Sequence, residues 1–513
     1  MKRLLFLTVF LQTVWSVSKA TPIVGTEALY PSDKASVVSV DYGTDSTVLT
    51  FVTPNGAGTK FHVGHGLYIV DDKGERHHAT GFNGIDADSV YILDGSGNMR
   101  FSVSFTPVGP GNLTLDVCDP CHFRIFGVHD SKTPPVIPPA VYGDDATEGS
   151  PQMFEPADVE IEGVLHGMQG KAGSVTFRAM EDYITIPMEE YSASVDGDGH
   201  FRMKFRTYAP KWEYLTLNTS FGRDVARIYF RPGDRIFIDL YDPSEGMEVK
   251  IRNTSGRSTM ERLTNTYTGI WFGSLDYVGN MTDNRRHYTD DGAYSHSEKD
   301  AAFKDHPFDE HMSSLRQDYE KNLRFADYII WHNRLSPYEA RLYREHIQMY
   351  YCWLCMETWG AVQSIARYSE QESRRREFGL LLEGQKSGMD FLNEIDPYSP
   401  SLLLCHYDGL SRLWATEAAL QLEEGMAQKD SGFCEKLMEE RHGIVRSLTG
   451  WDEGSVAMQI MTVCELHFMY DKYKDSHGME LRELYKKVRE GFKNPYLRQR
   501  LDSSYDSAMQ HVN

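Results

Sequence analysis

The sequence predicts a multidomain α+β protein: two β-sandwich-like domains followed by an all-α helical domain. Short segments rich in β-branched residues, separated by Gly, Asp and Asn, run to about residue 130 and recur after about residue 157, and helical spacing of apolar residues follows. The predicted organisation is a signal peptide at 1–20, a first β domain at 21–132, a Pro-rich linker at 133–156, a second β domain at 157–253 and the helical domain at 254–513.

Residues 1–20 have the order of a secretory signal peptide. Lys2 and Arg3 precede an apolar run at 4–14, and small residues surround the expected cleavage point near Ala20. The apolar run is shorter than the roughly 20 residues that a bilayer span needs. We therefore expect a cleaved signal and a periplasmic or extracellular protein without a membrane span.

The composition is acidic. Of the 513 residues, 74 are Asp or Glu and 53 are Lys or Arg, which gives a formal net charge of −21. Loss of residues 1–20, which carry three Lys or Arg, would make it about −24. Such a charge repels nucleic acid and anionic lipid, so nucleic acid is excluded as a partner. We interpret the acidity as an aid to solubility.

The first β domain is predicted from several short alternating segments about ten residues apart, the spacing of a sandwich. They are 35–41, 46–53, 60–70, 99–105, 113–117 and 122–128. The linker is predicted from six prolines around a polar run. In the second domain, Tyr191–Val195 and His200–Phe205 flank an Asp-Gly-Asp-Gly turn and predict a hairpin. Further strands are expected at 159–165, 215–217, 226–230 and 236–240.

The helical domain is predicted from apolar residues recurring at three and four positions, first over Glu310–Trp331. Ser336-Pro337-Tyr338-Glu339 predicts a helix start with a capping box, because Ser fits the N-cap, Pro the first helical position and Glu the third. That helix could run to about Tyr368. Further helices are expected at 408–425, 432–448, 454–473 and 479–492.

Two Cys-x-x-Cys motifs occur among the seven cysteines. Cys118 and Cys121 precede a segment that alternates like a strand, so no helix dipole would stabilise a thiolate there. In an oxidising compartment we interpret the pair as a structural disulfide or turn clip, with a redox pair as the alternative. Cys352 and Cys355 share a helix face with Cβ atoms about 5–6 Å apart, too far for a disulfide. We expect them, with Cys405, Cys434 and Cys464, to be buried and reduced.

The sequence predicts no metal site and no cofactor. His62 and His65, three apart on an expected strand, would face opposite sides, as would the adjacent His77 and His78. No Gly-x-Ser-x-Gly elbow, Walker loop or dinucleotide fingerprint stands in the required context. Aromatic residues around a polar stretch are candidates for a ligand groove, although aromatic side chains more often pack helix against sheet. These candidates are Tyr267, Trp271, Tyr277 and Tyr288.

Four stretches carry a family resemblance: VCDPCHFRIFGVHD at 117–130, VDGDGHF at 195–201, YFRPGDR at 229–235 and NPYL at 494–497. In these the chain resembles the N-terminal part of secreted TlpA-like thiol–disulfide oxidoreductases of the thioredoxin superfamily. The resemblance implies an exported accessory scaffold. In that family a thioredoxin domain with a Trp-Cys-x-x-Cys centre follows the helices; the sequence departs from this, so the family's activity is not carried over.

The leading hypothesis is therefore an exported, non-catalytic binding or accessory protein. Its partner would be a protein or small ligand, a thioredoxin-domain protein being one candidate. One alternative is a thiol–disulfide oxidoreductase that acts through Cys118 and Cys121 or with a separate thioredoxin partner. Another is a glycan-binding module or hydrolase that uses the aromatic groove.

Overall fold

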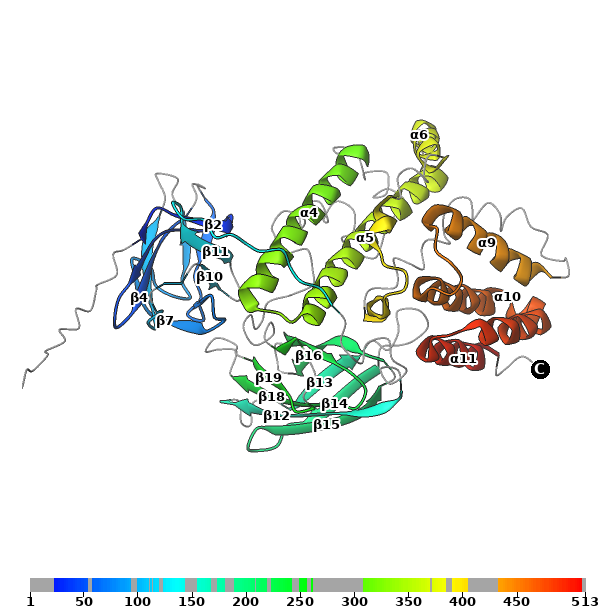
Figure 1. Ribbon diagram of the computed structural model, residues 1–513, viewed down its shortest axis with the longest axis horizontal. Helices are drawn as coiled ribbons and strands as arrows, with labels where there is room; N and C mark the ends of the chain where they lie inside the picture. Colours follow the sequence, from blue (N-terminus) through cyan, green and yellow to red (C-terminus); the bar gives the residue numbers. More distant parts are fainter. Residues whose placement is uncertain are drawn as a thin grey trace, which may run out of the picture. The chain divides into compact units, whose positions relative to one another are not determined.

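The computed structural model confirms a multidomain α+β fold, with sheet-rich parts before a helical part (Figure 1). By its contacts the chain divides into two compact units, Met1–Pro135 and Val136–Asn513. The residues described are 23–53, 58–93, 99–109, 111–112, 114–119, 123–143, 155–167, 173–179, 189–207, 209–218, 223–241, 249–255, 260–261, 308–369, 371–383, 390–404 and 432–509.

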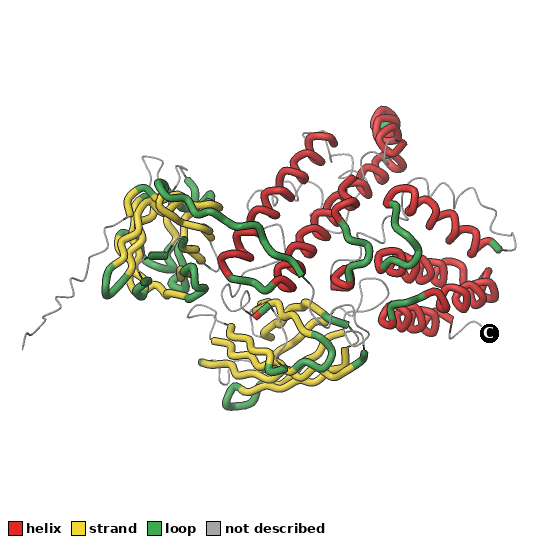
Figure 2. The backbone as a smooth tube through the Cα atoms, viewed as in Figure 1, coloured by secondary structure: helices red, strands yellow, loops and turns green. Residues whose placement is uncertain are grey.

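The first unit is built on one nine-stranded sheet in the order β1-β3-β4-β9-β7-β6-β10-β11-β2, with a separate two-stranded sheet β5-β8. The strands are β1 (Ile23–Val24), β2 (Thr26–Tyr30), β3 (Ser36–Tyr42), β4 (Thr47–Val52), β5 (Lys60–His62), β6 (Tyr68–Val70), β7 (Arg76–Asn83), β8 (Val90–Ile92), β9 (Arg100–Phe105), β10 (Leu115–Cys118) and β11 (Arg124–Asp130). Figure 2 shows these strands curling around a common interior, close to a barrel.

A single apolar core holds the two halves of this sheet together. It combines β3, β4 and β9 residues such as Leu49 and Phe101 with β6, β10 and β11 residues such as Ile69 and Val117. In β4 every second residue is buried, the period expected of a strand with one face on the core. Because apolar area removed from water supplies most of the folding free energy, this alternation determines the register of the sheet.

The expected single strand at 60–70 is wrong, because the chain turns between β5 and β6. The Leu67 N–H donates to the Gly64 carbonyl at 3.2 Å, and the Gly64 N–H donates to the Asp119 carboxylate at 2.7 Å. His65 therefore lies in a turn, where its Nδ1 atom is 2.6 Å from Asp88 Oδ2. Gly64 and Gly66, two of the five residues between these strands, are the sequence signal for this turn.

The second unit begins with a sandwich of two four-stranded sheets, β15-β12-β18-β19 and β14-β13-β16-β17. Its strands are β12 (Ala157–His166), β13 (Ser174–Ala179), β14 (Glu189–Ser194), β15 (His200–Thr207), β16 (Lys211–Asn218), β17 (Arg223–Phe230), β18 (Arg235–Tyr241) and β19 (Val249–Asn253). β12 pairs antiparallel with β15 and parallel with β18. Residues of both sheets, among them Ile161 and Leu215, share one buried core.

The helical part comprises α4 (Phe308–Asn333), α5 (Pro337–Tyr368), α6 (Glu372–Glu383), η5 (Asp390–Glu394), η6 (Pro400–Leu404), α9 (Phe433–Thr449), α10 (Val456–Gly491) and α11 (Pro495–Met509). The two helices expected at 454–473 and 479–492 are both present: α10 consists of two helices that meet at a kink, where His477 has non-helical backbone angles. The helix expected at 408–425 lies outside the described residues. Within those residues, no helix combines the length and the apolar character that a bilayer span requires.

Buried polar side chains join the second sandwich to the helices. The Tyr229 hydroxyl is 2.8 Å from the hydroxyl of Tyr338 at the start of α5, and Arg231 donates from Nε to Tyr229 at 3.2 Å. Elsewhere, Lys211 Nζ donates to the Tyr496 hydroxyl at the start of α11. Arg231 is fully buried and its guanidinium lies 4.9 Å from the Tyr338 ring centroid.

Candidate functional site

The strongest candidate site lies on the solvent-facing side of the β15-β12-β18-β19 sheet, which we call the outer face. Along β15 the burial alternates strictly, so Phe201 and Met203 enter the core whereas Arg202 and Lys204 point to solvent. The antiparallel register places Arg202 opposite Glu162 and Lys204 opposite Glu160. Cross-strand ion pairs follow, including Arg202 Nε to Glu162 Oε1 at 3.0 Å.

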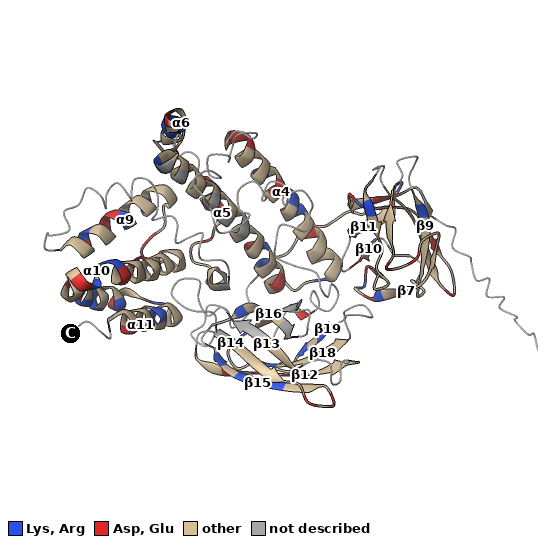
Figure 3. Ribbon diagram, turned by 180° about the vertical axis from the view of Figure 1, so that it is seen from behind, with Lys and Arg blue, Asp and Glu red and all other residues tan. Residues whose placement is uncertain are grey.

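The outer face carries more positive than negative groups, although the chain as a whole is strongly acidic. Its Lys and Arg residues are Arg202, Lys204, Arg206, Arg235, Lys250 and Arg252, and its Asp and Glu residues are Asp158, Glu160, Glu162 and Asp239. Figure 3 marks the basic positions in blue along these strands. Even the paired cations keep much of their surface in water: the Arg202 side chain is 64% exposed and that of Arg252 is 65% exposed.

Two aromatic rings lie among these charges. The Arg252 guanidinium lies 4.9 Å from the Phe237 ring centroid, and the Lys250 ammonium lies 5.2 Å from that of Tyr241. The Tyr241 ring also stacks on the His166 ring at 4.5 Å. Each cation is thus held over a ring face, where cation–π attraction stabilises it. The outer face therefore offers flat apolar area and positive charge side by side.

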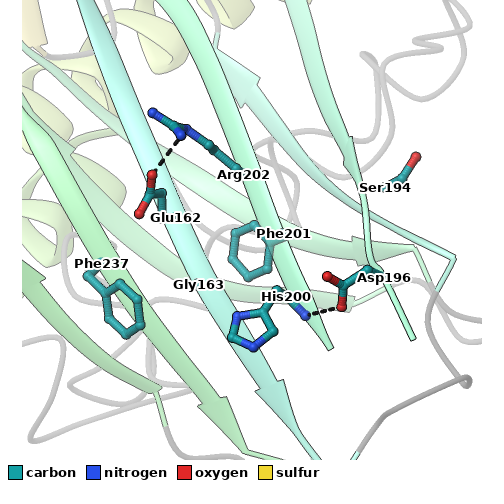
Figure 4. Close-up of a pocket in the computed structure, with 8 residues that line it drawn as sticks. All are labelled: Glu162, Gly163, Ser194, Asp196, His200, Phe201, Arg202 and Phe237. Carbon is teal, nitrogen blue, oxygen red and sulfur yellow. Dashed lines mark hydrogen bonds and ion pairs between the residues drawn. The ribbon is translucent and has the colours of Figure 1, made fainter. Parts of the chain in front are cut away.

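A pocket of about 370 Å³ opens at the end of the outer face near the β14–β15 turn (Figure 4). In Figure 4 the Glu162–Arg202 pair forms one rim and the Phe237 ring another, with the Phe201 ring between the strands. The pocket is lined by Glu162, Gly163, Ser194, Asp196, His200, Phe201, Arg202 and Phe237. Its walls combine apolar rings with donors and acceptors, the mixture that ligand sites use.

Gly163 determines the shape of this pocket. A Cβ atom at that position would lie 2.4 Å from the Phe201 ring and 2.4 Å from the Ile238 carbonyl oxygen, well inside van der Waals contact. Only glycine therefore lets the Phe201 ring lie across β12. The β14–β15 turn is fixed by Asp196, whose Oδ1 accepts from the backbone N–H groups of Asp198 and His200, each at 2.9 Å.

The pocket contains Ser194, His200 and Asp196, the residue types of a hydrolytic triad, but not the geometry. Figure 4 shows Ser194 pointing away from the His200 ring, and Asp196 accepts from the His200 backbone rather than from the imidazole. A triad requires the nucleophile to hydrogen-bond the imidazole and the imidazole to hydrogen-bond the carboxylate. This arrangement can hold a ligand, but it does not activate the Ser194 hydroxyl.

Of the predicted cysteine pair, only Cys118 is described. It ends β10 opposite Arg124 of β11, so the expected strand after the motif is confirmed and no helix begins there. Its side chain is buried. Burial, reinforced by the Asp116 carboxylate, raises the pKa of Cys118 far above its usual range. Cys121 lies outside the described residues, so the Cys118–Cys121 disulfide stays a prediction.

The helix cysteines have the environment expected of them. Cys352 and Cys355 are buried on α5, Cys434 and Cys464 are buried on α9 and α10, and none of the four is in a disulfide. Burial raises the pKa of Cys355 to about 12. Because the thiolate is the reactive form, the raised pKa holds Cys355 in its less reactive thiol form near neutral pH. Cys405 lies outside the described residues.

The predicted aromatic groove cannot be placed, because Tyr267, Trp271, Tyr277 and Tyr288 all lie outside the described residues. The outer-face pocket was not predicted from the sequence. The sequence contains a pattern that fits it. Charged and apolar residues alternate along both β12 and β15, the charged ones being acidic in β12 and basic in β15. In β18, Phe237 occupies one of the positions that otherwise hold polar residues. Recognising it required the parallel pairing of β12 with β18, which local sequence does not indicate.

The described residues also include one group of side chains with the composition of a metal site, Asp71, Glu75 and His77.

Comparison with known proteins gave no match to a family model, a curated protein or a solved structure.

Proposed function

We propose that the protein is an exported, non-catalytic binding or accessory protein that holds an acidic segment of a partner protein on its outer face. The observation that carries this proposal is the pocket beside Phe237, on a face where Lys and Arg outnumber Asp and Glu in a chain of net charge −21. Export is supported by residues 1–20, in which positive charges are followed by an apolar run and then by small residues, the order of a signal peptide.

The charge distribution supports an acidic rather than a basic ligand. The rest of the chain is more negative than the outer face, so long-range repulsion would steer an acidic segment away from other surfaces and toward this one. Aromatic rings such as Phe237 would add apolar contact, which the exposed ion pairs alone do not supply. A thioredoxin-domain protein, the partner that the TlpA-like resemblance implies, would fit if it presents such a segment.

The alternative of a redox enzyme acting through Cys118 has less support. A thiol–disulfide exchange centre needs an accessible thiolate. Burial of Cys118 and the neighbouring Asp116 carboxylate both oppose the thiolate, and the strand after the motif supplies no helix dipole. Accordingly we propose that Cys118 is part of the core of the first sheet.

The experiment that tests the proposal is binding of a fluorescent poly-L-glutamate 20-mer to the purified protein at low salt. We expect saturable binding that Arg202→Gln weakens about tenfold and Phe237→Ala weakens comparably, because each removes a wall of the pocket. The matched control is Arg206→Gln, which removes the same charge from the same strand about 14 Å away along β15 and should change the affinity less than twofold.

Two results would overturn the proposal. The first is the absence of saturable binding to poly-L-glutamate, or equal loss in Arg202→Gln and Arg206→Gln, which would reveal only diffuse charge attraction. The second is tighter binding of polygalacturonate than of poly-L-glutamate, with the same dependence on Phe237, which would make the ligand an acidic glycan instead of a protein segment.

A further inference from the structure

The turn between β6 and β7 places three potential metal ligands on one side of a hairpin. Asp71 follows β6, Glu75 precedes β7, and His77 is the second residue of β7. The register pairs His77 with Ile69, which lies in the core. Because side chains two apart share a face, Asp71 shares the face of Ile69 and Glu75 shares that of His77. All three side chains therefore lie on the same side.

The turn holds the first of these groups in place. Asp71 Oδ1 accepts from the backbone N–H groups of Lys73 and Glu75, each at 2.9 Å. The Gly74 N–H donates to the Asp71 carbonyl, and Gly74 has a φ of 79°, the left-handed conformation that favours glycine. Asp71 Oδ2 is left facing His77. Such fixed support for a ligating carboxylate is typical of metal centres.

His77 supplies the observation that points to a ligand. The residue is only 9% exposed, and its Nε2 atom is buried without a hydrogen-bond partner. Its nearest carboxylate oxygen, Asp71 Oδ2, is 3.7 Å away, beyond hydrogen-bonding distance. Leaving a buried polar nitrogen unsatisfied costs about 1–3 kcal/mol. The buried imidazole nitrogen thus faces the Asp71 carboxylate at a distance too long for a direct hydrogen bond.

The spacing suits a bridging cation. Ligands about 2.0–2.2 Å from a tetrahedral zinc ion are about 3.4 Å from one another, close to the 3.7 Å between His77 Nε2 and Asp71 Oδ2. One ligand atom from each of the three residues lies within 4.8 Å of the others. Glu75 is exposed, so its side chain can close the remaining distance by rotating.

We propose that Asp71, Glu75 and His77 bind one divalent transition-metal ion of the zinc class, with water completing the coordination. One imidazole and two carboxylates match zinc better than the all-oxygen sets that Ca²⁺ and Mg²⁺ prefer. His77 was not predicted as a ligand because the sequence was searched only for pairs of histidines, whereas the other proposed ligands are carboxylates across the turn. This proposal is independent of the outer face, which lies in the other unit.

The test is calorimetric titration of the chelator-treated full chain with Zn²⁺ alone. We expect one site whose affinity falls about tenfold or more in Glu75→Gln and in His77→Gln. Glu75 is exposed, so its substitution leaves folding intact and keeps the test decisive even if His77→Gln is poorly folded. The matched control is His78→Ala, which removes the exposed neighbouring imidazole and should bind as the unaltered chain does.

The thermal midpoint gives a second readout, since an ion that binds only the folded chain raises it. Zn²⁺ should raise the midpoint of the unaltered chain and of His78→Ala, and raise it much less in Glu75→Gln. Equal binding and equal thermal shifts in Glu75→Gln and the unaltered chain would mean that any bound zinc lies elsewhere, and the proposal would be wrong. Absence of saturable binding at millimolar Zn²⁺ would also overturn it, whereas a response to Mg²⁺ of the same size would overturn the assignment to the zinc class.

Discussion

Asp502 of α11 accepts from three donors of α10. Arg489 donates from Nε to Oδ1 at 2.7 Å and from Nη2 to Oδ2 at 2.9 Å, and the Tyr485 hydroxyl donates to Oδ1 at 2.7 Å. Partial burial alone would raise the pKa of Asp502, but the hydrogen bonds from Arg489 and Tyr485 outweigh it and hold the pKa below its usual value. The side chain thus ties the two helices together in its ionised form.

The stabilisation by Asp502 should therefore depend on pH. Because its folded-state pKa lies below the unfolded value of about 3.9, the carboxylate stabilises the fold above that pH, and the contribution is lost as the pH falls through the folded-state pKa. In urea titrations, we expect the difference in unfolding free energy between the unaltered chain and Asp502→Asn to be largest above about pH 5 and to shrink toward about pH 2. A difference that stays constant over this range would contradict the assignment; the exposed Asp506→Asn serves as the control.

Residue identity alone indicated some of these roles and not others. Asparagine is favoured at a helix N-cap, and the Oδ1 of Asn494, just before α11, accepts from the backbone N–H groups of Tyr496 and Leu497. By contrast, nothing in the sequence around Phe237 indicates which strands lie beside it in the sheet. Local hydrogen-bonding preferences can be read from neighbouring residues, whereas the environment of a strand residue is determined by segments distant in the chain.

Among the elements, α5 has the best-defined beginning. The Ser336 hydroxyl accepts from the Glu339 N–H at 3.3 Å, and Glu339 Oε2 accepts from the Ser336 N–H at 2.9 Å, so the predicted capping box is confirmed. The start of α5 matters because Tyr338, the second residue of the helix, contacts Tyr229 of the sandwich.

We expect Ser336→Ala to lower the unfolding free energy by about 1 kcal/mol. The Glu339 N–H loses its acceptor, the Ser336 hydroxyl, and the reciprocal bond from the backbone N–H of residue 336 to the Glu339 carboxylate is weakened. Glu339→Gln is the matched control, since glutamine also completes a capping box and should cost less. Chemical denaturation followed by circular dichroism at 222 nm measures both. A cost for Glu339→Gln equal to or above that of Ser336→Ala would contradict this account.

The sequence predicted elements best where a single period continues over many residues. α4 and α9 lie within two residues of their predicted positions for this reason. β7 was missed because its residues, RHHATGFN, alternate weakly and end in glycine, phenylalanine and asparagine. The break between the two halves of α10 was predicted because the polar run before Met479 interrupts the apolar period, and the non-helical His477 lies in that run.

At the scale of the second unit, Arg231 links sheet and helix. It is fully buried, it directly follows β17, and its backbone N–H donates to Asp234 Oδ2 in the turn before β18. Its guanidinium lies between the Tyr229 and Tyr338 rings, 5.6 and 4.9 Å from their centroids. The sandwich and the helices therefore share a buried polar contact instead of meeting only through apolar surfaces.

Arg231→Met should destabilise the chain by about 3 kcal/mol or more, because it removes a buried cation from partners arranged around it. We also expect the sandwich and the helices to unfold less cooperatively, so tryptophan fluorescence and circular dichroism at 222 nm would give separate transitions. Arg235→Met, at a side chain that is 73% exposed, is the control and should change stability by less than about 0.5 kcal/mol. Coincident transitions at the original midpoint would contradict this role for Arg231.

The parallel pairing of β12 with β18 has a consequence for how the chain acquires its fold. Glu160 pairs with Arg235, 75 positions later, and β12 is a central strand with a neighbour on each side. Closing so long a loop costs entropy before any contact repays it, so the centre of this sheet forms late. A chain that emerges from its N-terminus must therefore keep one edge of β12 without a partner strand until β18 has followed. During that interval the edge could pair with another copy, which makes the second sandwich the step at which slow folding and aggregation compete.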